Sequence, residues 1–344
     1  RDGALVTAAP LVFFAKDTNG DGKADIQETL FDGFGQGNQQ HRLNGLRWGL
    51  DNWIHCANGD SGGLIKNAKT GEIVDVSGRD FRIRADEGAL DTESGNSQFG
   101  ICFDDWGSRF GCANWLPAWH YALDDLYMRR NPHFSPGNPR EYIVEPEKLY
   151  PTSRTLARFN DFEYANKATS TCGIEIYRDT VLGQEYYGNS FVCEPVHDLV
   201  LRTVLEPNGV TFSGHRAAGE EQSEFLTSHD NWFRPVMART GPDGALYIVD
   251  MYRQVIEHPE YISKETQAKL NLRAGDDKGR IYRVVPVHGS LRTVPTLSAL
   301  STAELVEQLN SPNGTLRDMA HQQLIERADR NAVAPLRALL NSGP

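Results

Sequence analysis

Residues 41–60, HRLNGLRWGLDNWIHCANGD, decide the fold class of this chain. Leu46 and Trp48 precede the dipeptide Asp51-Asn52, and Ile54 follows it. Alternating apolar residues are typical of a strand with one buried face, and a polar dipeptide between two such runs favours a tight turn. The stretch therefore predicts a strand, a two-residue turn and a second strand.

The same pattern returns twice along the chain. Residues 236–250 (VMARTGPDGALYIVD) hold a turn at 242–244, and residues 99–114 (FGICFDDWGSRFGCAN) are a looser version. Repetition of one supersecondary unit is typical of a fold built from similar blades. We therefore predict a mainly β fold, organised as a β-propeller.

Composition and charge narrow the possible classes of protein. The 344 residues include 32 Gly and 17 Pro, which suits a turn-rich β architecture better than a helical bundle. The formal net charge of −11 argues against nucleic acid as the main partner. No apolar run approaches the ~18–20 residues that a membrane helix needs. The chain opens at Arg1 without an initiator Met or a signal peptide, so we expect a processed chain or a piece of a longer one.

The cysteines form no known cofactor motif. None belongs to C-x-x-C or C-x-x-C-H, so this stretch holds neither a thiol redox motif nor a haem attachment motif. Cys172 and Cys193 flank one expected hairpin, and Cys102 and Cys112 flank a tighter one. Each pair could be cross-strand neighbours or two buried thiols. We favour a Cys172–Cys193 disulfide in an exported protein, periplasmic or at the cell surface.

Residues 17–28 (DTNGDGKADIQE) match the twelve-residue calcium loop. Oxygen donors fall at positions 1, 3, 5, 9 and 12, glycine stands at position 6, and position 7 could offer its carbonyl oxygen. Carboxylates this close together repel one another unless a hard cation lies between them. The alternative is an acidic turn exposed to solvent. The predicted metal ligands are Asp17, Asn19, Asp21, Lys23, Asp25 and Glu28.

Helical patterns replace strand patterns near the end of the sequence. Ser301 and Glu304 form a capping box, Thr315 is expected to cap a second helix, and Asn331 could cap a third. Short amphipathic helices with these breaks look like the start of HEAT-type repeats, which need stacked neighbours to bury both faces.

Two domains are therefore expected. Residues 1–288 form the β-propeller, which could lack its first blade, and residues 289–344 form a HEAT-like helical segment. Residues 115–139 read as a long irregular insertion. An insertion of this size in a β protein usually covers a binding face or packs on a neighbouring domain.

Residues 41–60 resemble a blade of the soluble quinoprotein sugar dehydrogenases, the six-bladed propellers that include glucose and sorbosone dehydrogenases. The family pattern is a histidine, a leucine five residues on, a Gly-x-Asp turn and a closing Gly-Asp. Here it falls on His41, Leu46, Gly49, Asp51 and Gly59-Asp60. Residues 188–205 and the stretch that begins at Arg234 resemble later blades. The resemblance implies six blades in a complete propeller.

The chain is still more similar to large bacterial multidomain proteins labelled membrane-bound dehydrogenases. The phrases QFGICFDDWGSRF, FVCEPVHDLV, DNWFRPV and RAGDDKGRIYRVVP carry this resemblance over most of residues 11–286. Such proteins join a propeller to HEAT repeats and, further on, to a domain with a C-x-x-C-H haem motif. The resemblance implies a haem domain of the same longer chain as a partner.

The quinoprotein resemblance also implies catalytic residues. His41 falls where these enzymes keep their general base, and Arg234 falls on one of two arginines that contact the quinone. Val236 stands where the second arginine would be. His197 lies near the position of their cofactor lysine.

Other positions of the cofactor site differ from the family pattern. Asn96 and Ser97 stand in the place of an Arg-Asn pair. Residues 115–117 (WLP) fall where backbone carbonyls would hold a calcium ion beside the quinone. The residues predicted to contact a cofactor are His197, Asn44 and Asp60.

These positions imply a sugar or alcohol dehydrogenase-like domain. His41 would take the proton of a sugar hydroxyl while hydride passes to a pyrroloquinoline quinone (PQQ). Arg234 would stabilise negative charge on the quinone oxygen, and a calcium ion would polarise the quinone carbonyl. Electrons would then pass to the haem domain. Two plainer alternatives stay open. His41 could line a channel without chemistry, and Arg234 could make a salt bridge or a backbone hydrogen bond inside a blade.

The other class of function is a non-catalytic propeller that binds a polysaccharide or a protein partner. Tryptophan side chains could stack on sugar rings or could fill the blade cores: Trp106, Trp115, Trp119 and Trp232. An enzyme should gather His41, His197 and Arg234 around one central pocket, and a binding module should scatter them.

Overall fold

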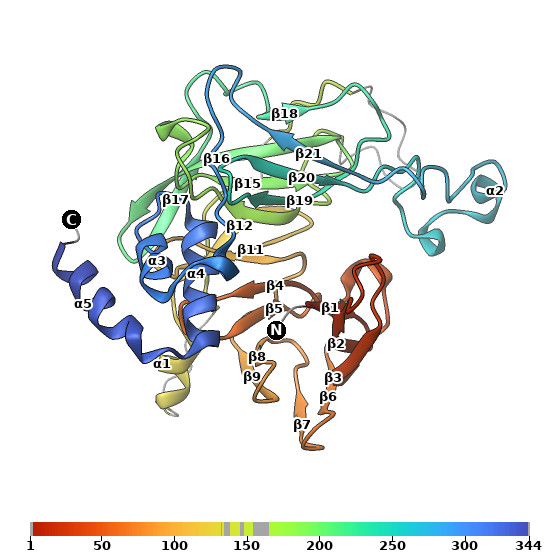
Figure 1. The fold of residues 1–344 in the computed structure, drawn as a ribbon. Coiled ribbons are helices and arrows are strands. Elements are labelled where there is room, and N and C mark those ends of the chain that lie inside the picture. Colours follow the sequence, from red (N-terminus) through yellow and green to blue (C-terminus); the bar gives the residue numbers. More distant parts are fainter. Residues whose placement is uncertain (1–2, 132, 134–137, 145–147, 154–164, 343–344) are drawn as a thin grey trace.

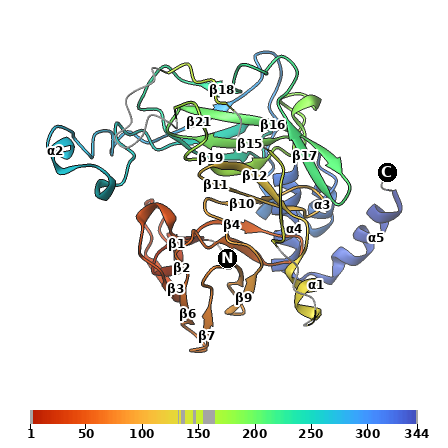
Figure 2. The same ribbon diagram turned by 180° about the vertical axis from the view of Figure 1, so that it is seen from behind.

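The chain folds into five antiparallel β-sheets followed by a short helical segment (Figure 1, Figure 2). The structure is a computed structural model, and it describes residues 3–131, 133, 138–144, 148–153 and 165–342. Figure 1 shows the sheets in succession, from the first in red through yellow to the later ones in green and blue. The predicted mainly β fold is confirmed. No helix within the described residues has the length and apolar character needed to cross a membrane.

Two strands of the first sheet come from a segment that interrupts the second sheet in the sequence. Its order is β1 (Ala4–Ala8), β2 (Leu11–Lys16), β3 (Ile26–Phe34), β6 (Gly63–Asn67) and β7 (Ile73–Asp75). The strands β6 and β7 lie in the sequence between two neighbouring strands of the second sheet, so the chain leaves that sheet and returns.

The other four sheets each run outward from a first strand. The second contains β4 (Asn44–Trp48), β5 (Ile54–Ala57), β8 (Asp80–Arg84) and β9 (Ala89–Glu93). The third contains β10 (Ile101–Phe103), β11 (Arg109–Ala113), β12 (Leu116–Tyr121) and β13 (Arg140–Tyr142). The fourth contains β14 (Cys172–Ile176), β15 (Ser190–Glu194), β16 (Leu199–Asn208) and β17 (Thr211–His215), with β18 (Leu226–Thr227) beside β16. The last contains β19 (Pro235–Thr240), β20 (Leu246–Asp250) and β21 (Arg280–Val284).

The first strands of these four sheets meet at their N-terminal ends. A Cβ atom on Gly45 of β4 would lie 2.7 Å from the Cα of Gly100, just before β10. A Cβ atom on Gly173 of β14 would overlap the backbone of Val236 in β19. Gly45, Gly100 and Gly173 all have positive φ angles, which glycine adopts without strain. Glycine is therefore required where the four strands converge.

Apolar side chains fill the spaces between neighbouring sheets. One core cluster joins the first two sheets and includes Val12, Phe31 and Phe81. A second joins the third and fourth sheets, and a third joins the fourth and fifth. Sheets that pack face to face around a shared set of first strands have the arrangement of propeller blades. No strand ladder among the described residues joins the last sheet to the first, so the sheets do not close into a ring by strand pairing.

The predicted turn at Asp51-Asn52 is confirmed, and the predicted irregular insertion is wrong. The turn at Asp51-Asn52 joins β4 to β5, and Asn52 has a φ of +65°. Residues 115–139 are predicted to be irregular, but Leu116–Tyr121 forms β12 and Asp125–Arg130 forms the helix α1. The sequence of β12 does not alternate between apolar and polar residues, because all six of its residues are buried. It therefore lacks the pattern by which the other strands are predicted.

The remaining helices lie in the connections and at the C-terminal end. The α-helices are α2 (Lys264–Gln267), α3 (Thr302–Gln308), α4 (Gly314–Arg327) and α5 (Val333–Ser342). Short 3-10 helices span Gln39–His41, Gln184–Tyr186, Pro259–Tyr261, Leu297–Ala299 and Arg330–Ala332. The capping box of Ser301 and Glu304 is confirmed at α3.

Two predicted caps are each two residues off. Asn313 rather than Thr315 caps α4, because its Oδ1 atom accepts the Leu316 amide at 2.7 Å. Asp329 rather than Asn331 caps the turn that leads into α5. Asn is a stronger cap than Thr, whereas Asp and Asn rank alike, so at the second site the side chain that faces the free amide decides.

The helical segment is docked on the sheets at the C-terminal ends of the first strands. The Gly314 amide donates to the Arg178 carbonyl at 2.7 Å, just beyond β14. The Asn313 side chain donates to Asp179 at 2.6 Å, and Arg178 pairs with Asp318 at 2.6 Å. These contacts cover the C-terminal ends of the first strands. The opposite end, where Gly45, Gly100 and Gly173 lie, is called the glycine end below, and loops form its surface.

The cysteine expectation is partly wrong. Cys172 and Cys193 are opposite one another in β14 and β15, as cross-strand neighbours. All five cysteines are nevertheless free and buried. Cys172 and Cys193 pack in the core between the fourth and fifth sheets, where a thiol acts as a small apolar group.

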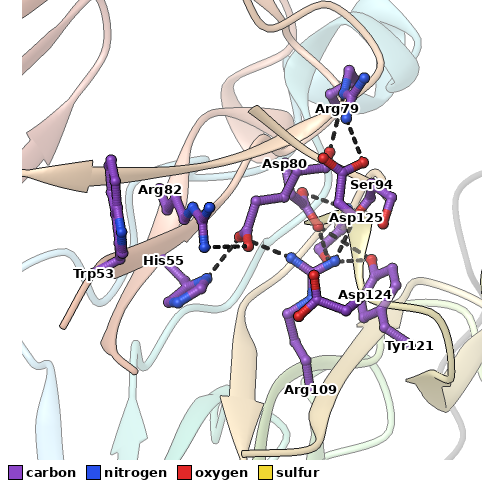
Figure 3. Close-up of polar contacts among 12 residues, drawn as sticks. Trp53, His55, Arg79, Asp80, Arg82, Ser94, Arg109, Tyr121, Asp124 and Asp125 are labelled. Carbon is purple, nitrogen blue, oxygen red and sulfur yellow. Dashed lines mark hydrogen bonds and ion pairs between the residues drawn. The ribbon is translucent and has the colours of Figure 1, made fainter. Parts of the chain in front are cut away.

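A buried polar network joins the second sheet to the third (Figure 3). His55 of β5 contacts Glu93 at 2.7 Å through Nδ1 and Asp51 at 3.0 Å through Nε2. Arg109 of β11 donates to the same Glu93 at 2.9 Å, and Arg82 also lies beside it. Figure 3 shows His55, Arg82 and Arg109 pointing toward one another from separate strands.

The network predicts a pH-dependent stability. Burial opposes protonation of His55, but its hydrogen bonds to Asp51 and Glu93 outweigh that effect and raise the pKa above 6.5. When the pKa of His55 is higher in the folded than in the unfolded chain, its protonation stabilises the fold. This contribution is fully present at a pH below the unfolded pKa and is lost as pH rises through the folded pKa. Urea unfolding between about pH 6 and about pH 9 should therefore show the native chain losing stability relative to His55→Gln. Equal pH profiles for the two proteins would contradict this account.

Candidate functional site

The predicted site residues lie at the glycine end of the convergent strands. His41 and Arg234 come just before β4 and β19, the first strands of their sheets. Asp60 follows β5, and His197 lies between β15 and β16. In an antiparallel sheet, the start of the first strand and the connection from second to third strand share one edge. The topology therefore brings these residues to one end of the molecule.

Hydrogen bonds between these loops link the second sheet to the third, the third to the fourth and the fourth to the fifth. A further bond joins the connection after β20 to the 3-10 helix before β4, so it links the fifth sheet back to the second. These bonds are Asn44 Nδ2 to Gln98 O at 2.9 Å, Thr171 N to Asn114 O at 3.0 Å, Arg234 Nη1 to Pro195 O at 2.7 Å and Gln40 Nε2 to Ile256 O at 2.7 Å.

His41 is held between an amide and a carboxylate. Its Nδ1 lies 3.6 Å from Asp60 Oδ2, and Gln98 Nε2 lies 3.1 Å from its Nε2. Gln98 Oε1 accepts the Asn114 amide at 2.9 Å, so the NH2 of Gln98 faces the imidazole. That NH2 can only donate, so it is placed to donate to a ring nitrogen of His41 that accepts. The side chain is 25% exposed and can meet a ligand.

A pocket with a cavity volume of about 260 Å³ opens next to Asp60 and Gln98, the two side chains that contact His41. Polar side chains form one part of its wall and aromatic rings another. The lining residues are Asp60, Asn96, Gln98, Ala113, Asn114, Trp115, Leu116, Trp119, Arg140 and Tyr142. The loops before β10 and after β11 and the strand β13 supply most of them. The pocket therefore lies between the second and third sheets.

A buried carboxylate fixes the loop that carries Asn96 and Gln98. Asp80 is fully buried and accepts the Ser97 amide at 2.8 Å and the Ser97 hydroxyl at 2.7 Å. Tyr121 donates to the same carboxylate at 3.1 Å, and Asp80 and Tyr121 appear in Figure 3. Ser97, predicted to replace a cofactor asparagine, is thus a structural anchor rather than a pocket residue. Its neighbours Asn96 and Gln98 face the pocket instead.

Asp60 is the predicted cofactor residue that does line the pocket. Asn96 Nδ2 donates to Asp60 Oδ1 at 2.6 Å, while Oδ2 faces His41. Asp60 has a φ of +69°, which a non-glycine residue rarely adopts and which recurs at binding sites. Asn44 does not line the pocket, because its side chain donates to the carbonyls of Arg42 and Gln98.

His197 is engaged within the fourth sheet. Its Nδ1 lies 3.0 Å from Glu194, and its Nε2 accepts the Asn166 amide at 3.0 Å. Burial raises the pKa of Glu194, but the bonds from His197 and nearby amides outweigh this and lower it to about 2. Both ring nitrogens of His197 therefore have protein partners.

Arg234 is engaged in the same way. Its guanidinium donates to three backbone carbonyls, on Pro195, Arg253 and Gln254, and to Asp198 at 2.9 Å. The side chain is 8% exposed. Burial raises the pKa of Asp198 to about 7, although Arg234 opposes the shift. This is the alternative in which Arg234 makes a salt bridge and backbone hydrogen bonds between loops.

The structure places His41 against Asp60, which lines the pocket, and keeps His197 and Arg234 in separate contacts. No hydrogen bond or ion pair among the described residues joins His41 to either of them. Residues that the sequence did not indicate complete the pocket. Gln98 and Asn114 lie just outside strands, and Arg140 and Tyr142 belong to a stretch without a clear pattern. The one sequence feature that pointed to this part of the pocket was Trp115, just before β12, which was predicted to stack on sugar rings.

Two of the four tryptophans predicted to stack on sugar rings line the pocket, and two do not. Trp115 and Trp119 line the pocket. Trp106 is 79% exposed, and Trp232 packs near Tyr252 with ring centroids 5.7 Å apart.

The predicted calcium loop is an exposed turn between β2 and β3. Asp17 accepts the amides of Gly20 at 2.7 Å and Gly22 at 2.8 Å, and these bonds lower its pKa. Asp25 accepts the amide and hydroxyl of Thr18, which lower its pKa too. Among the described residues, no three His, Cys, Asp or Glu side chains lie close enough to hold a metal ion.

The other predicted ligands lie along the same turn. Asn19 donates to Asp25 Oδ1 at 3.2 Å, and Asp21 accepts the Lys23 amide at 2.8 Å. Glu28 lies within β3, opposite Phe14 of β2. A calcium ion would therefore need amide and backbone oxygens of the turn in addition to carboxylates.

Comparisons with known proteins identify a family and several solved structures of low similarity. A family model described as a domain of unknown function (DUF7133) matches residues 1–288. No curated protein matches the chain. A luciferin-regenerating enzyme is similar at a TM-score of 0.44 and 11% identity, over 83% of this chain and 74% of that one. A proposed oxidoreductase (glucose dehydrogenase) from Thermus thermophilus has a TM-score of 0.40 and 16% identity, over 74% and 76%. A further glucose dehydrogenase has a TM-score of 0.39 and 16% identity, over 70% and 69%. At TM-scores below 0.5 these likenesses carry no argument about activity.

Proposed function

The chain belongs to the DUF7133 family, and from its pocket we propose that it is a sugar-binding domain whose ligand lies beside His41. The pocket combines a carboxylate and several amides with exposed aromatic rings. Sugars present hydroxyl groups around the ring and apolar C–H groups on its faces. Hydroxyls suit amides and carboxylates, and C–H faces suit aromatic rings. This combination is the observation that supports the proposal.

The size of the pocket favours one sugar ring. Its volume of about 260 Å³ lies just below the range of about 300–1,000 Å³ that is usual for ligand pockets. A longer chain of sugars would extend along the exposed rim at Trp115. The predicted exported location, if correct, would place such a pocket in contact with extracellular polysaccharide.

A dehydrogenase is the second candidate, and the His41–Asp60 pair favours it. An unprotonated ring nitrogen of His41 could take the proton of a bound hydroxyl, and Asp60 could stabilise the imidazolium that forms. The donor amide of Gln98 occupies one ring nitrogen, so a ligand hydroxyl would have to displace it.

The quinone that this candidate requires does not suit the described residues. PQQ carries three carboxylates, which call for cationic or amide donors. The donors of Arg234 and both nitrogens of His197 already bind protein groups, and the pocket lining holds one cation, Arg140. We therefore assign no hydride step or electron transfer to a haem domain, and we favour sugar binding without oxidation.

One experiment separates the two candidates. Sugars added to the purified protein should quench or shift tryptophan fluorescence, because Trp115 and Trp119 line the pocket. The protein incubated with PQQ and calcium should not reduce an artificial electron acceptor when an aldose is added. Binding without reduction supports the binding domain, and reduction that His41→Asn abolishes would establish the dehydrogenase. Absence of binding to any sugar tested would refute both.

We also propose that calcium binds the turn at residues 17–28. The ligands would be Asp17, Asn19, Asp21, the Lys23 carbonyl and Asp25, with Glu28 from β3. A ligand that binds only the folded state stabilises it by about 2.7 kcal/mol at a hundred times its Kd. Calcium should therefore raise the midpoint of thermal unfolding by several degrees relative to a chelator.

Matched variants make the calcium prediction specific. Asp17→Asn should remove the calcium-dependent shift, and Asp32→Asn, on the exposed part of β3, should keep it. No shift in the native chain would show that the turn is only an acidic loop.

A further inference from the structure

We propose that the preferred ligand of the pocket is an acidic sugar, a uronic acid whose carboxylate is bound by Arg140. This inference rests on the proposed sugar-binding function and adds a charge requirement to it. Arg140 is the one cation among the described residues that line the pocket. Asp60, on the second-sheet side of the same pocket, is the one carboxylate in that lining.

Arg140 is positioned for a ligand by contacts that leave part of it free. Its Nε donates to Asn138 Oδ1 at 3.1 Å, and its guanidinium carbon lies 5.1 Å from the centre of the Trp119 ring. These contacts hold the plane of the guanidinium. Its two Nη groups make no hydrogen bond or ion pair to any residue in the described part of the chain. A carboxylate can accept two parallel hydrogen bonds from such a guanidinium edge.

Most other arginines near this part of the fold are already neutralised. Arg109 pairs with Glu93 at 2.9 Å, Arg82 with Asp91 at 2.9 Å, and Arg79 with Asp125 at 2.6 Å. In a chain with a net charge of −11, a pocket arginine that has no carboxylate partner among the described residues is a local exception. An anionic ligand would supply that partner.

The rest of the wall suits the uncharged part of a uronic acid. The Asn114 side chain makes no hydrogen bond within the described residues and is partly exposed, so it can bind a hydroxyl. Trp115 and Tyr142 are 50% and 51% exposed, and their rings meet edge to face at 83°. One of these faces can pack on the C–H groups of the sugar.

The two charges also set the direction of the ligand. Asp60 repels a carboxylate and accepts hydroxyls, whereas Arg140 attracts the carboxylate. A uronic acid therefore binds with its carboxylate toward β13 and its hydroxyls toward Asp60 and His41. A neutral hexose would lack one end of this arrangement and should bind more weakly.

The test compares galacturonate with galactose, which differ at one carbon. Isothermal titration at low salt should give about tenfold tighter binding for galacturonate, because hydrogen bonds to a charged group are stronger than neutral ones. Arg140→Gln should bring the two affinities together while galactose binding is kept. Arg130→Gln, on α1 outside the pocket, is the matched control and should preserve the preference.

The outcomes separate this inference from the function on which it rests. Equal binding of both sugars to the native chain, or a preference that survives in Arg140→Gln, would overturn the acidic-sugar assignment and leave sugar binding intact. Failure of both sugars to bind would overturn the proposed function itself. Circular dichroism and thermal unfolding of each variant confirm that it is folded before its affinity is interpreted.

Discussion

Replacement of Arg234 by alanine should lower the free energy of unfolding by about 3–5 kcal/mol, the usual cost of breaking a buried ion pair. Arg234 is one of the most extensively bonded side chains of the structure, with three carbonyls and Asp198 as partners. Its loss leaves the Asp198 carboxylate buried without a cation and leaves the carbonyls without donors. Urea unfolding of Arg234→Ala against the exposed Arg330→Ala measures the difference.

The pH profile gives this prediction a second readout. Asp198 has a pKa of about 7 in the folded chain, above its unfolded value, so its contribution to stability falls as pH rises toward 7. Without Arg234 that pKa should rise further, and the loss should continue to higher pH. The deficit of Arg234→Ala should thus be smaller at about pH 5 than at about pH 8. A variant of native stability that loses only ligand binding would instead make Arg234 a ligand contact.

Replacement of Asn313 by aspartate should detach the helical segment from the sheets. The Asn313 amide is fully buried and donates to Asp179 Oδ2 at 2.6 Å and to the Gly241 carbonyl at 2.8 Å. Aspartate keeps the cap of α4 but points a second carboxylate at two acceptors. We expect a loss of about 3–4 kcal/mol, as for other uncompensated buried charges.

A matched variant separates the effect of the added charge from the loss of the bridge. Asn313→Ser keeps an N-cap and loses the two bridging hydrogen bonds without adding a charge, so it should cost less than Asn313→Asp, about 1–3 kcal/mol. Limited proteolysis should cut Asn313→Asp faster than Asn313→Ser between β21 and α3, where the chain would be freed. Similar cutting of both variants would mean that a second carboxylate at this position does not detach the segment.

Local structure could be predicted from the sequence where one strand and its neighbour are adjacent in the chain. The hairpin of β4 and β5 follows from alternation around Asp51-Asn52, and the hairpin of β19 and β20 follows from Gly244, whose φ is +86°. Strands with distant partners could not be placed. The strand β6 pairs with β3 across the intervening β4 and β5, and nothing in its own residues specifies that partner.

The candidate site was only half predictable for the same reason. His41 and Asp60 share one short stretch, so a single motif indicates both. Arg140 and Tyr142 reach the pocket because β13 pairs with β12, from which it is separated in the chain by α1 and its flanking loops. Arg234 and His197 matched a family position, but burial and nearby carbonyls decide their role, and those depend on the folded loops.

A crystal structure of the protein soaked with galacturonate tests the central claim most directly. The account predicts density for one sugar ring in the pocket, packed on Trp115, with its carboxylate at Arg140 and its hydroxyls toward Asp60 and His41. Density at another surface, such as the exposed Trp106, with the pocket empty at a concentration that saturates binding in solution, would contradict it.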